Sequence, residues 1–190
     1  MSEPVRITAV LGSVTPPGRL HCAFAEALER LDPANATVDL IDLATLDLDF
    51  ADGRPPEELG AGPFTEALGS ADAVVLATPV YRGSLTGALK NALDLTPIPA
   101  LRDTPVALVA MGGSHHHYLG AERHLRDVLS FFGALVLPTA VYLSSRDFDD
   151  GVPGERAVSE LDALLASAVT LGAARRGAEP LGPPPLAAGF

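Results

Sequence analysis

The chain has 190 residues, 47% of them hydrophobic, and carries 24 acidic against 13 basic side chains, a formal net charge of −11. A single domain of this length buries a substantial core. The acidic balance disfavours nucleic acid as a partner. The sequence has no apolar run of membrane-spanning length and no basic-then-apolar start, so we expect a cytoplasmic protein that does not enter a membrane.

Cys22 is the single cysteine, which excludes an internal disulfide. It falls early in an expected helix. Because cysteine is among the residues most often buried, we expect Cys22 in the core. A thiolate stabilised by the helix N-terminus is the alternative.

Residues 5–11, VRITAVL, are rich in β-branched and apolar side chains and predict the first strand. A loop with glycines, prolines and hydroxyl side chains follows at 12–21, and a helix is expected over 22–31. Such a strand–loop–helix passage is typical of a phosphate cradle, although its spacing is neither a GxGxxG nor a Walker motif. An ordinary turn is the alternative.

Residues 37–43 alternate in polarity and predict a second strand. The acidic segment 47–62, punctuated by proline and glycine, is expected as a surface connection. A short helix is predicted over 63–71.

Residues 73–78, AVVLAT, predict a strand buried on both faces. Pro79 cannot extend the hydrogen-bond ladder, so the chain must leave the sheet there. It then enters a helix near Leu85, in which Leu89 and Leu93 continue one apolar stripe. Ligands of open α/β sheets bind at the carboxyl ends of the strands, so we expect the site in the loop between this strand and this helix. This loop carries Tyr81, Arg82, Gly83 and Ser84.

Residues 104–111 predict a fourth strand, which ends in the glycine–serine loop 112–114. A helix over 120–132 and a fifth strand over 134–143, interrupted at Pro138, follow. The remaining elements are a final amphipathic helix over 155–171 and, from Gly172, an extended or disordered Gly/Pro/Ala-rich tail.

Five strands that alternate with helices predict an α/β fold, a doubly wound parallel sheet with helices on both faces. The flavodoxin-like strand order 2-1-3-4-5 brings the loops after strands one, three and four to one switch point. Three loops therefore converge on one ligand.

The sequence resembles the NAD(P)H-dependent FMN reductase family, especially the reductase components of two-component alkanesulfonate monooxygenases. The matching motifs are LGS at 11–13, TPVY at 78–81 with SLTGALKNALDL after it, and GGS at 112–114 before LRDVLSFFGA. The resemblance implies a flavodoxin-like FMN-binding domain over 1–172, with 173–190 as the tail. It also implies that FMN and NADPH or NADH are the ligands, and that a flavin-dependent monooxygenase is a candidate partner.

In this family the first loop holds the FMN phosphate, the second lies along the flavin ring and the third borders its other edge. This chain departs from the family twice, with Thr15 in place of the usual arginine and Gly18 in place of a usual serine. Hydride transfer needs no protein acid or base, so we assign no catalytic side chain. The implied cofactor contacts are Ser13, Thr15, Arg19, Leu20, His21, Pro79, Val80, Tyr81, Arg82, Gly83, Ser84, Gly112, Gly113, Ser114 and His115.

Three consecutive histidines, His115 to His117, cannot share one helix face, and no Cys, Asp or Glu lies at a fitting interval. We therefore expect a solvated or nicotinamide-contacting loop, with His115 nearest the flavin, and no metal. A metal site is the alternative.

Two other functions remain open. A flavodoxin-type electron carrier would use the same fold, but such carriers usually sandwich the flavin between aromatic side chains, and this chain has no Trp and three Tyr. A quinone or azo-dye reductase would share the fold, the flavin and the hydride donor.

Three further expectations concern ligands and assembly. Arg19 and Arg82 favour NADPH, or both coenzymes, because arginine suits a 2′-phosphate. The apolar positions of 88–95 spread beyond one stripe and predict a homodimer or homotetramer. Thr15 and Gly18 weaken the phosphate loop and predict that FMN exchanges as a substrate.

Overall fold

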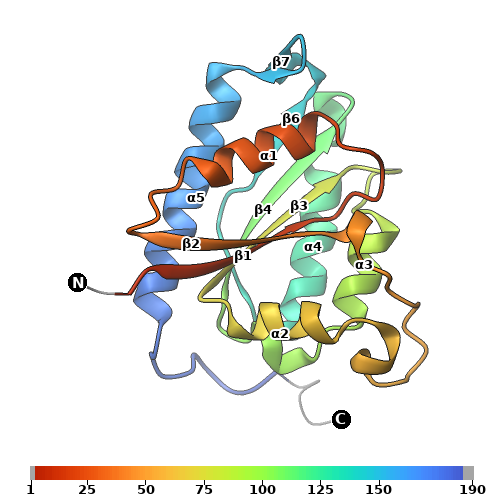
Figure 1. The fold of residues 1–190 in the computed structure, drawn as a ribbon, viewed down its shortest axis with the longest axis vertical. Helices are drawn as coiled ribbons and strands as arrows, with labels where there is room; N and C mark the ends of the chain where they lie inside the picture. Colours follow the sequence, from red (N-terminus) through yellow and green to blue (C-terminus); the bar gives the residue numbers. More distant parts are fainter. Residues whose placement is uncertain (1–2, 186–190) are drawn as a thin grey trace.

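A twisted parallel sheet forms the centre of the molecule (Figure 1). The computed structural model describes residues 3–185. The sheet order is β2-β1-β3-β4, and β5 and β6 share the fifth position, both pairing in parallel with β4. This confirms the predicted fold and strand order. The strands are β1 (Val5–Leu11), β2 (Ala36–Asp42), β3 (Ala73–Pro79), β4 (Pro105–Gly112), β5 (Leu135–Val136) and β6 (Val141–Ser144).

Five α-helices cover the sheet, two on one face and three on the other (Figure 1). The first face carries α1 (Arg19–Glu29) and α5 (Glu155–Arg175), and the second carries α2 (Gly62–Ser70), α3 (Gly87–Asp94) and α4 (Tyr118–Phe132). The 3₁₀ turns are η1 (Leu43–Thr45), η2 (Pro56–Leu59), η3 (Ile98–Leu101), η4 (His115–His117) and η5 (Ser145–Asp147), and a small hairpin joins β7 (Phe148–Asp149) to β8 (Val152–Pro153).

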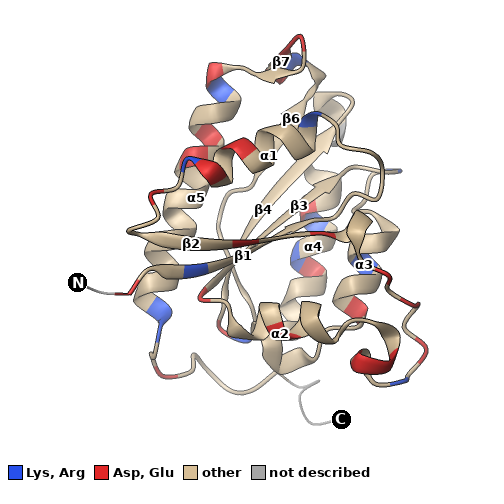
Figure 2. Ribbon diagram, in the orientation of Figure 1, with Lys and Arg blue, Asp and Glu red and all other residues tan. Residues whose placement is uncertain are grey.

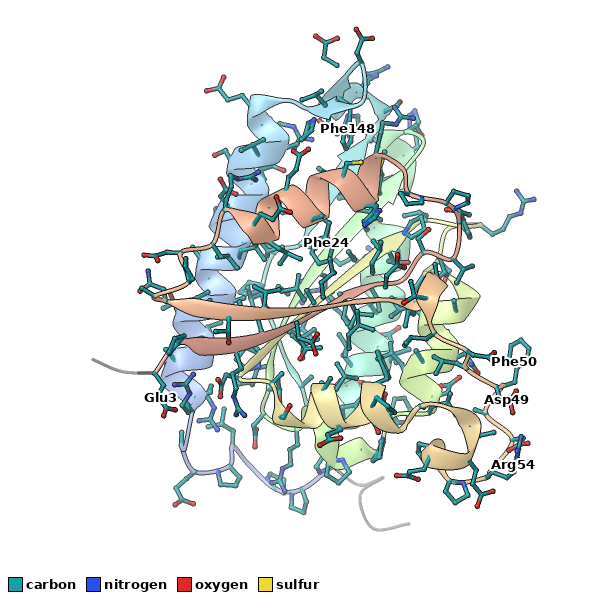
Figure 3. All side chains as sticks on the ribbon, in the orientation of Figure 1. Glu3, Phe24, Asp49, Phe50, Arg54 and Phe148 are labelled. Atoms are coloured by element: carbon teal, nitrogen blue, oxygen red, sulfur yellow. The ribbon has the colours of Figure 1, made fainter. Side chains whose placement is uncertain are left out.

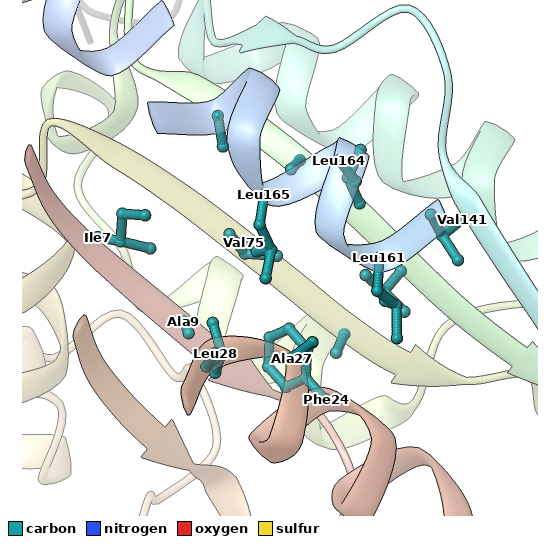
Figure 4. Close-up of a cluster of buried hydrophobic side chains, with 14 of the residues drawn as sticks. Ile7, Ala9, Phe24, Ala27, Leu28, Val75, Val141, Leu161, Leu164 and Leu165 are labelled. Atoms are coloured by element: carbon teal, nitrogen blue, oxygen red, sulfur yellow. The ribbon is translucent and has the colours of Figure 1, made fainter. Parts of the chain in front are cut away.

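The core has two layers because side chains alternate across each strand. Ile7 on β1 and Val75 on β3 pack against Phe24 of α1 and Leu161 of α5, as Figure 4 shows. The neighbouring positions, such as Leu76, face α3 and α4 instead. A strand covered on both faces must be apolar throughout, which explains the unbroken AVVLAT run.

The final helix is longer than expected. It ends at Arg175, not at Leu171, and Gly172 is buried within it. A Cβ at Gly172 would lie 2.8 Å from the Cγ1 of Val5, so the glycine permits close packing against β1 and does not end the helix. α5 has the length and composition of a membrane-spanning helix, but one of its faces is part of the core. Of the predicted tail, residues 186–190 lie outside the described residues.

Two other expectations were wrong in detail. Cys22 is exposed, because it lies on the outer face of α1 beside the buried pair Ala23 and Phe24. The connection over 47–62 is not entirely a surface segment, since Leu59 is buried there against Leu95. The structure buries four of the five apolar residues on which the predicted oligomer interface rested, Leu89, Ala92, Leu93 and Leu95.

Candidate functional site

The loops after β1, β3 and β4 meet at the carboxyl edge of the sheet and enclose a cleft of about 430 Å³. This volume lies within the usual range of small-molecule and cofactor sites. The cleft is lined by Leu11, Ser13, Thr15, Pro16, Pro17, Gly18, Arg19, Leu20, His21, Asp42, Pro79, Val80, Tyr81, Met111, Gly112, Gly113 and Ser145.

The first loop ends at the uncapped N-terminus of α1. Its N-cap residue, Gly18, makes no side-chain capping bond, and the first turn contains no acidic residue. The first N–H groups of a helix have no partner within the helix and carry partial positive charge. The side chains of Ser13 and Thr15 lie in the same loop, 2.9 Å apart between their hydroxyl oxygens. This end of the cleft is therefore suited to an anion.

Arg19 adds a full positive charge at the same end. Its guanidinium carbon lies 5.7 Å from the centre of the Phe148 ring, a cation–π distance. Phe148 belongs to the β7–β8 hairpin, which was not predicted, and lies beyond α1 in Figure 3. The hairpin thus contributes to the position of Arg19.

The hairpin is connected to α5 through Asp147. This carboxylate accepts hydrogen bonds from the backbone N–H of Ser144 and from Arg156, which also contacts Glu160. Burial raises the pKa of Asp147, but the bonds from Arg156 and Ser144 outweigh it and hold the pKa below its usual value. The charged carboxylate anchors this side of the cleft.

The second loop is a tight turn between β3 and α3. The backbone N–H of Tyr81 donates to the carbonyl of Ser84 at 2.9 Å, and the reverse bond is 3.0 Å. Arg82 and Gly83 both have positive φ, 54° and 79°, as a type I′ turn requires. Tyr81 lines the cleft and is 48% exposed, whereas the two residues at the tip do not line it.

The turn packs against α4. The Oγ of Ser84 lies 2.8 Å from the Nδ1 of His124. A Cβ on Gly120 would overlap the carbonyl oxygen of Gly83, so only glycine allows this close approach. The helix therefore fixes the height of the turn above the sheet.

Two buried threonines join the first and second loops. Thr86 donates its hydroxyl to the carbonyl of Gly12 and accepts from the N–H of Leu89, and so caps α3. Its own N–H donates to the hydroxyl of Thr78 at 3.2 Å. A Cβ on Gly12 would lie 2.9 Å from the Cβ of Leu89, so the loop must approach α3 closely.

The third loop follows β4. The hydroxyl of Tyr142 donates to the carbonyl of Ser114 at 2.7 Å, and burial raises the pKa of this phenol. The Nε2 of His115 lies 3.4 Å from the Oγ of Ser144. Ser114 and His115 are thus held on β6 behind the cleft.

The structure brings ten of the fifteen predicted residues into the cleft lining. The other five adjoin it: Arg82 and Gly83 form the tip of the turn, Ser84 faces α4, and Ser114 and His115 contact β6. The predicted residues in the lining are Ser13, Thr15, Arg19, Leu20, His21, Pro79, Val80, Tyr81, Gly112 and Gly113.

Sequence reasoning missed three polar or polarisable side chains in the lining, Asp42, Met111 and Ser145. Asp42 is the last residue of β2, Met111 lies near the end of β4, and Ser145 follows β6. The strand order would have identified them, because each lies at the carboxyl edge beside the switch point. Among the described residues, no three His, Cys, Asp or Glu side chains form a group that could hold a metal ion.

Comparison with known proteins assigns the chain to a family. The model of the NADPH-dependent FMN reductase family matches residues 5–149. An FMN reductase (NADPH) from Pseudomonas aeruginosa is 39% identical over 155 residues, 79% of this chain and 82% of the relative. A quinone reductase from Escherichia coli is 31% identical over 151 residues, 72% of this chain and 76% of the relative.

The solved structure of apo NADH:FMN oxidoreductase (EMOB) is also similar. It superposes with a TM-score of 0.69 at 27% identity, and the match covers 87% of this chain and 89% of that one. Residues 5–149, which the family model matches, include β1, β3, β4 and the loops that form the cleft. The chain therefore belongs to the NADPH-dependent FMN reductase family and is an NAD(P)H-dependent oxidoreductase that uses FMN.

Proposed function

We propose that FMN binds in the cleft with its phosphate at the N-terminus of α1 and its ring along Pro79 to Tyr81. The observation that carries the proposal is the uncapped, acid-free start of α1 beside Arg19. Backbone N–H groups and an arginine are the donors that a phosphate prefers. These residues fit the phosphate-bearing end of FMN.

Bound FMN supplies the ring that accepts hydride. The protein's task is to orient the two reactants and to exclude water. In our proposal Tyr81 stacks beside the ring, and Gly112 and Gly113 border its other edge without side chains that would obstruct the nicotinamide. Ser84 acts by holding the turn against α4, and Ser114 and His115 act by fixing the third loop on β6.

We further propose that FMN is an exchangeable substrate, released after reduction to a flavin-dependent monooxygenase. Thr15 and Gly18 replace an arginine and a serine that would each add a contact to the phosphate. Each missing contact weakens binding by about 1 to 3 kcal/mol, or roughly one to two powers of ten in Kd.

Dialysis followed by steady-state assays tests this proposal. The dialysed protein is expected to be colourless, and oxidation of NADPH or NADH is expected to saturate with added FMN. A protein that stays yellow and turns over only with a quinone would contradict it. That result would favour the quinone reductase alternative, which the likeness to the Escherichia coli quinone reductase keeps open.

We also propose a homo-oligomer and a cytoplasmic location. Two exposed phenylalanines flank α3: Phe50, 84% exposed, lines a hollow with Ala88, and Phe131, 64% exposed, lines another with Leu93. Each phenylalanine adjoins other apolar residues of its hollow, and contiguous exposed apolar surface favours association. Light scattering at micromolar concentration should therefore exceed the 19.6 kDa of one chain, and a monomer would contradict the proposal.

A further inference from the structure

A second polar cavity, of about 440 Å³, lies at the opposite edge of the sheet, where β1, β3 and β4 begin and α5 ends. Among the described residues, its lining contains Arg6, Arg102, Arg175 and Arg176 but the carboxylates of only two residues, Asp72 and Asp103. The lower end of α5 is coloured as basic in Figure 2, on a molecule in which acidic residues predominate. In a chain of net charge −11, such a local excess of positive charge is unusual, because the guanidinium groups repel one another unless an anionic group balances them.

The pairing within the cavity is uneven, and Asp72 has the most partners. Arg176 donates to its Oδ2 at 2.6 Å, and Arg6 donates from its side chain at 3.3 Å and from its backbone N–H at 2.8 Å. Arg176 also donates to the carbonyls of Glu3 and Pro4. These two arginines are therefore engaged in structure.

The other two arginines have weaker partners. The Nε of Arg102 lies 3.6 Å from the Oδ2 of Asp103, beyond hydrogen-bond distance, and this oxygen accepts from the N–H of Leu181. Arg175 donates to the backbone carbonyl of Glu179, while its Nε atom is buried with no acceptor among the described residues. A buried guanidinium N–H without an acceptor is uncommon and requires an explanation.

The last turn of α5 offers part of an explanation for Arg175, since a cation there offsets the negative end of the helix dipole. That effect needs only charge near the helix end. It leaves unexplained why the Nε has no acceptor among the described residues, and why Arg102, which follows η3, lines the same cavity.

We propose that this cavity binds a small tetrahedral oxyanion of the phosphate or sulfate type, held by the guanidinium groups of Arg102 and Arg175. The planar fork of arginine matches such an anion with two parallel N–H donors. The site lies at the other end of the strands from the cleft, so its occupant would be additional to FMN and the nicotinamide coenzyme.

Calorimetric titration of FMN-saturated protein tests the proposal, because FMN already fills the phosphate end of the cleft. Sodium sulfate and sodium phosphate are compared with sodium chloride at equal ionic strength. The double variant Arg102→Gln, Arg175→Gln leaves the bonds to Asp72 intact. The matched control is Arg30→Gln, which removes an arginine paired with Asp162 at 2.7 Å on the α1–α5 surface.

We expect saturable binding of sulfate and phosphate, weakened about tenfold or more in the double variant and unchanged in Arg30→Gln. Equal responses to sulfate and chloride, or equal binding by the double variant, would overturn the proposal. If the double variant does not fold, Arg102→Lys keeps the charge but loses the fork and should still weaken binding. A glycerol phosphate titration distinguishes sources: tighter binding than inorganic phosphate would identify a phosphomonoester.

Discussion

The Nδ1 of His124 lies 2.8 Å from the Oγ of Ser84 and joins the turn that carries Tyr81 to α4. Neither residue lines the cleft. The contact nevertheless sets the position of an aromatic side chain that we place against the flavin, because the turn has reciprocal backbone bonds between Tyr81 and Ser84.

Replacing Ser84 by Ala should raise the KM for FMN several-fold with a smaller effect on kcat, since the turn loses its attachment to α4. His124→Leu should do the same. The double variant should be less than additive, with a coupling of about 0.5 to 1.5 kcal/mol. Steady-state assays with varied FMN measure this. Ser130→Ala, which removes a hydroxyl bonded within the exposed face of α4, serves as the control and should have no effect.

Thr86 is the residue that links the first two loops, so Thr86→Val should affect both stability and FMN binding. Loss of the helix cap and of a buried hydroxyl partner should lower the free energy of unfolding by about 2 kcal/mol. Urea denaturation measures the first effect and fluorescence titration of FMN the second. Thr170→Val, on the exposed side of α5, should stay within about 0.5 kcal/mol of the parent. Equal behaviour of the two variants would argue against the linking role.

The ionisation of Asp72 makes the stability of the fold depend on pH, and the protein should be less stable in acid. Burial raises its pKa, but hydrogen bonds from Arg176 and Arg6 outweigh burial and lower the pKa from 3.8 to about 2. Because the pKa of Asp72 is lower in the folded than in the unfolded protein, its ionised carboxylate stabilises the fold at pH values above the unfolded pKa. This stabilisation is lost as the pH falls through the folded pKa. The contribution is about 2 kcal/mol above pH 4 and disappears by about pH 2.

Chemical denaturation at pH 7 and at pH 3 tests this dependence. Asp72→Asn should be less stable at pH 7, and its difference from the parent should narrow at pH 3. Asp162→Asn breaks an exposed pair with Arg30 and should cost less than about 1 kcal/mol at either pH. A constant difference for Asp72→Asn across this range would show that the carboxylate charge is not the cause.

Arg82 lies at the tip of the turn, outside the cleft lining, and we expect it to contact the nicotinamide coenzyme. Arg82→Asn removes the charge but tolerates the positive φ. We expect kcat/KM for NADPH to fall about tenfold, the loss of one charge-assisted contact to a 2′-phosphate, and the value for NADH to be unchanged. Arg54→Asn, in an exposed pair with Asp52, is the control. An equal fall in kcat/KM for both coenzymes would show that Arg82 supports the turn and does not contact the 2′-phosphate.

Thr15→Arg should convert FMN from an exchangeable to a retained ligand. An added guanidinium beside the start of α1 should lower the Kd for FMN by roughly ten- to a hundredfold. Retention of the yellow colour through dialysis is the measurement. Thr15→Gln, a shorter polar side chain without charge, should remain colourless. Equal retention of FMN by both variants would show that the added charge is not the cause.

Much of the fold was predictable because β1, β3 and β4 are mostly apolar and each ends in, or just before, a glycine or a proline. The right-handed crossovers then leave few arrangements of the strands. The ends of α5 were less predictable. Gly172 suggests a helix end by its propensity, and only its contact with Val5 shows why a glycine is required inside the helix.

The sequence predicted the loops that form the cleft but not the contacts that hold those loops in place. Tyr81 and Ser13 line the cleft as expected, because their loops follow strands directly. Phe148 was not predicted, because a two-residue strand paired with another leaves no periodic pattern, and its contact with Arg19 spans more than a hundred residues. The exposure of Cys22 likewise depends on which face of α1 meets the sheet.

The placement of α5 has a consequence for biosynthesis. β1 is made first, yet the face that it shares with Phe24 and Val75 is covered by Leu161 and Leu165, which are made last (Figure 4). A nascent chain that ends near residue 150 already contains α1, but the part of the sheet that α5 covers would still be exposed to water. Such surfaces attract chaperones and aggregate, so the protein should commit to its native state only after the ribosome releases the final helix.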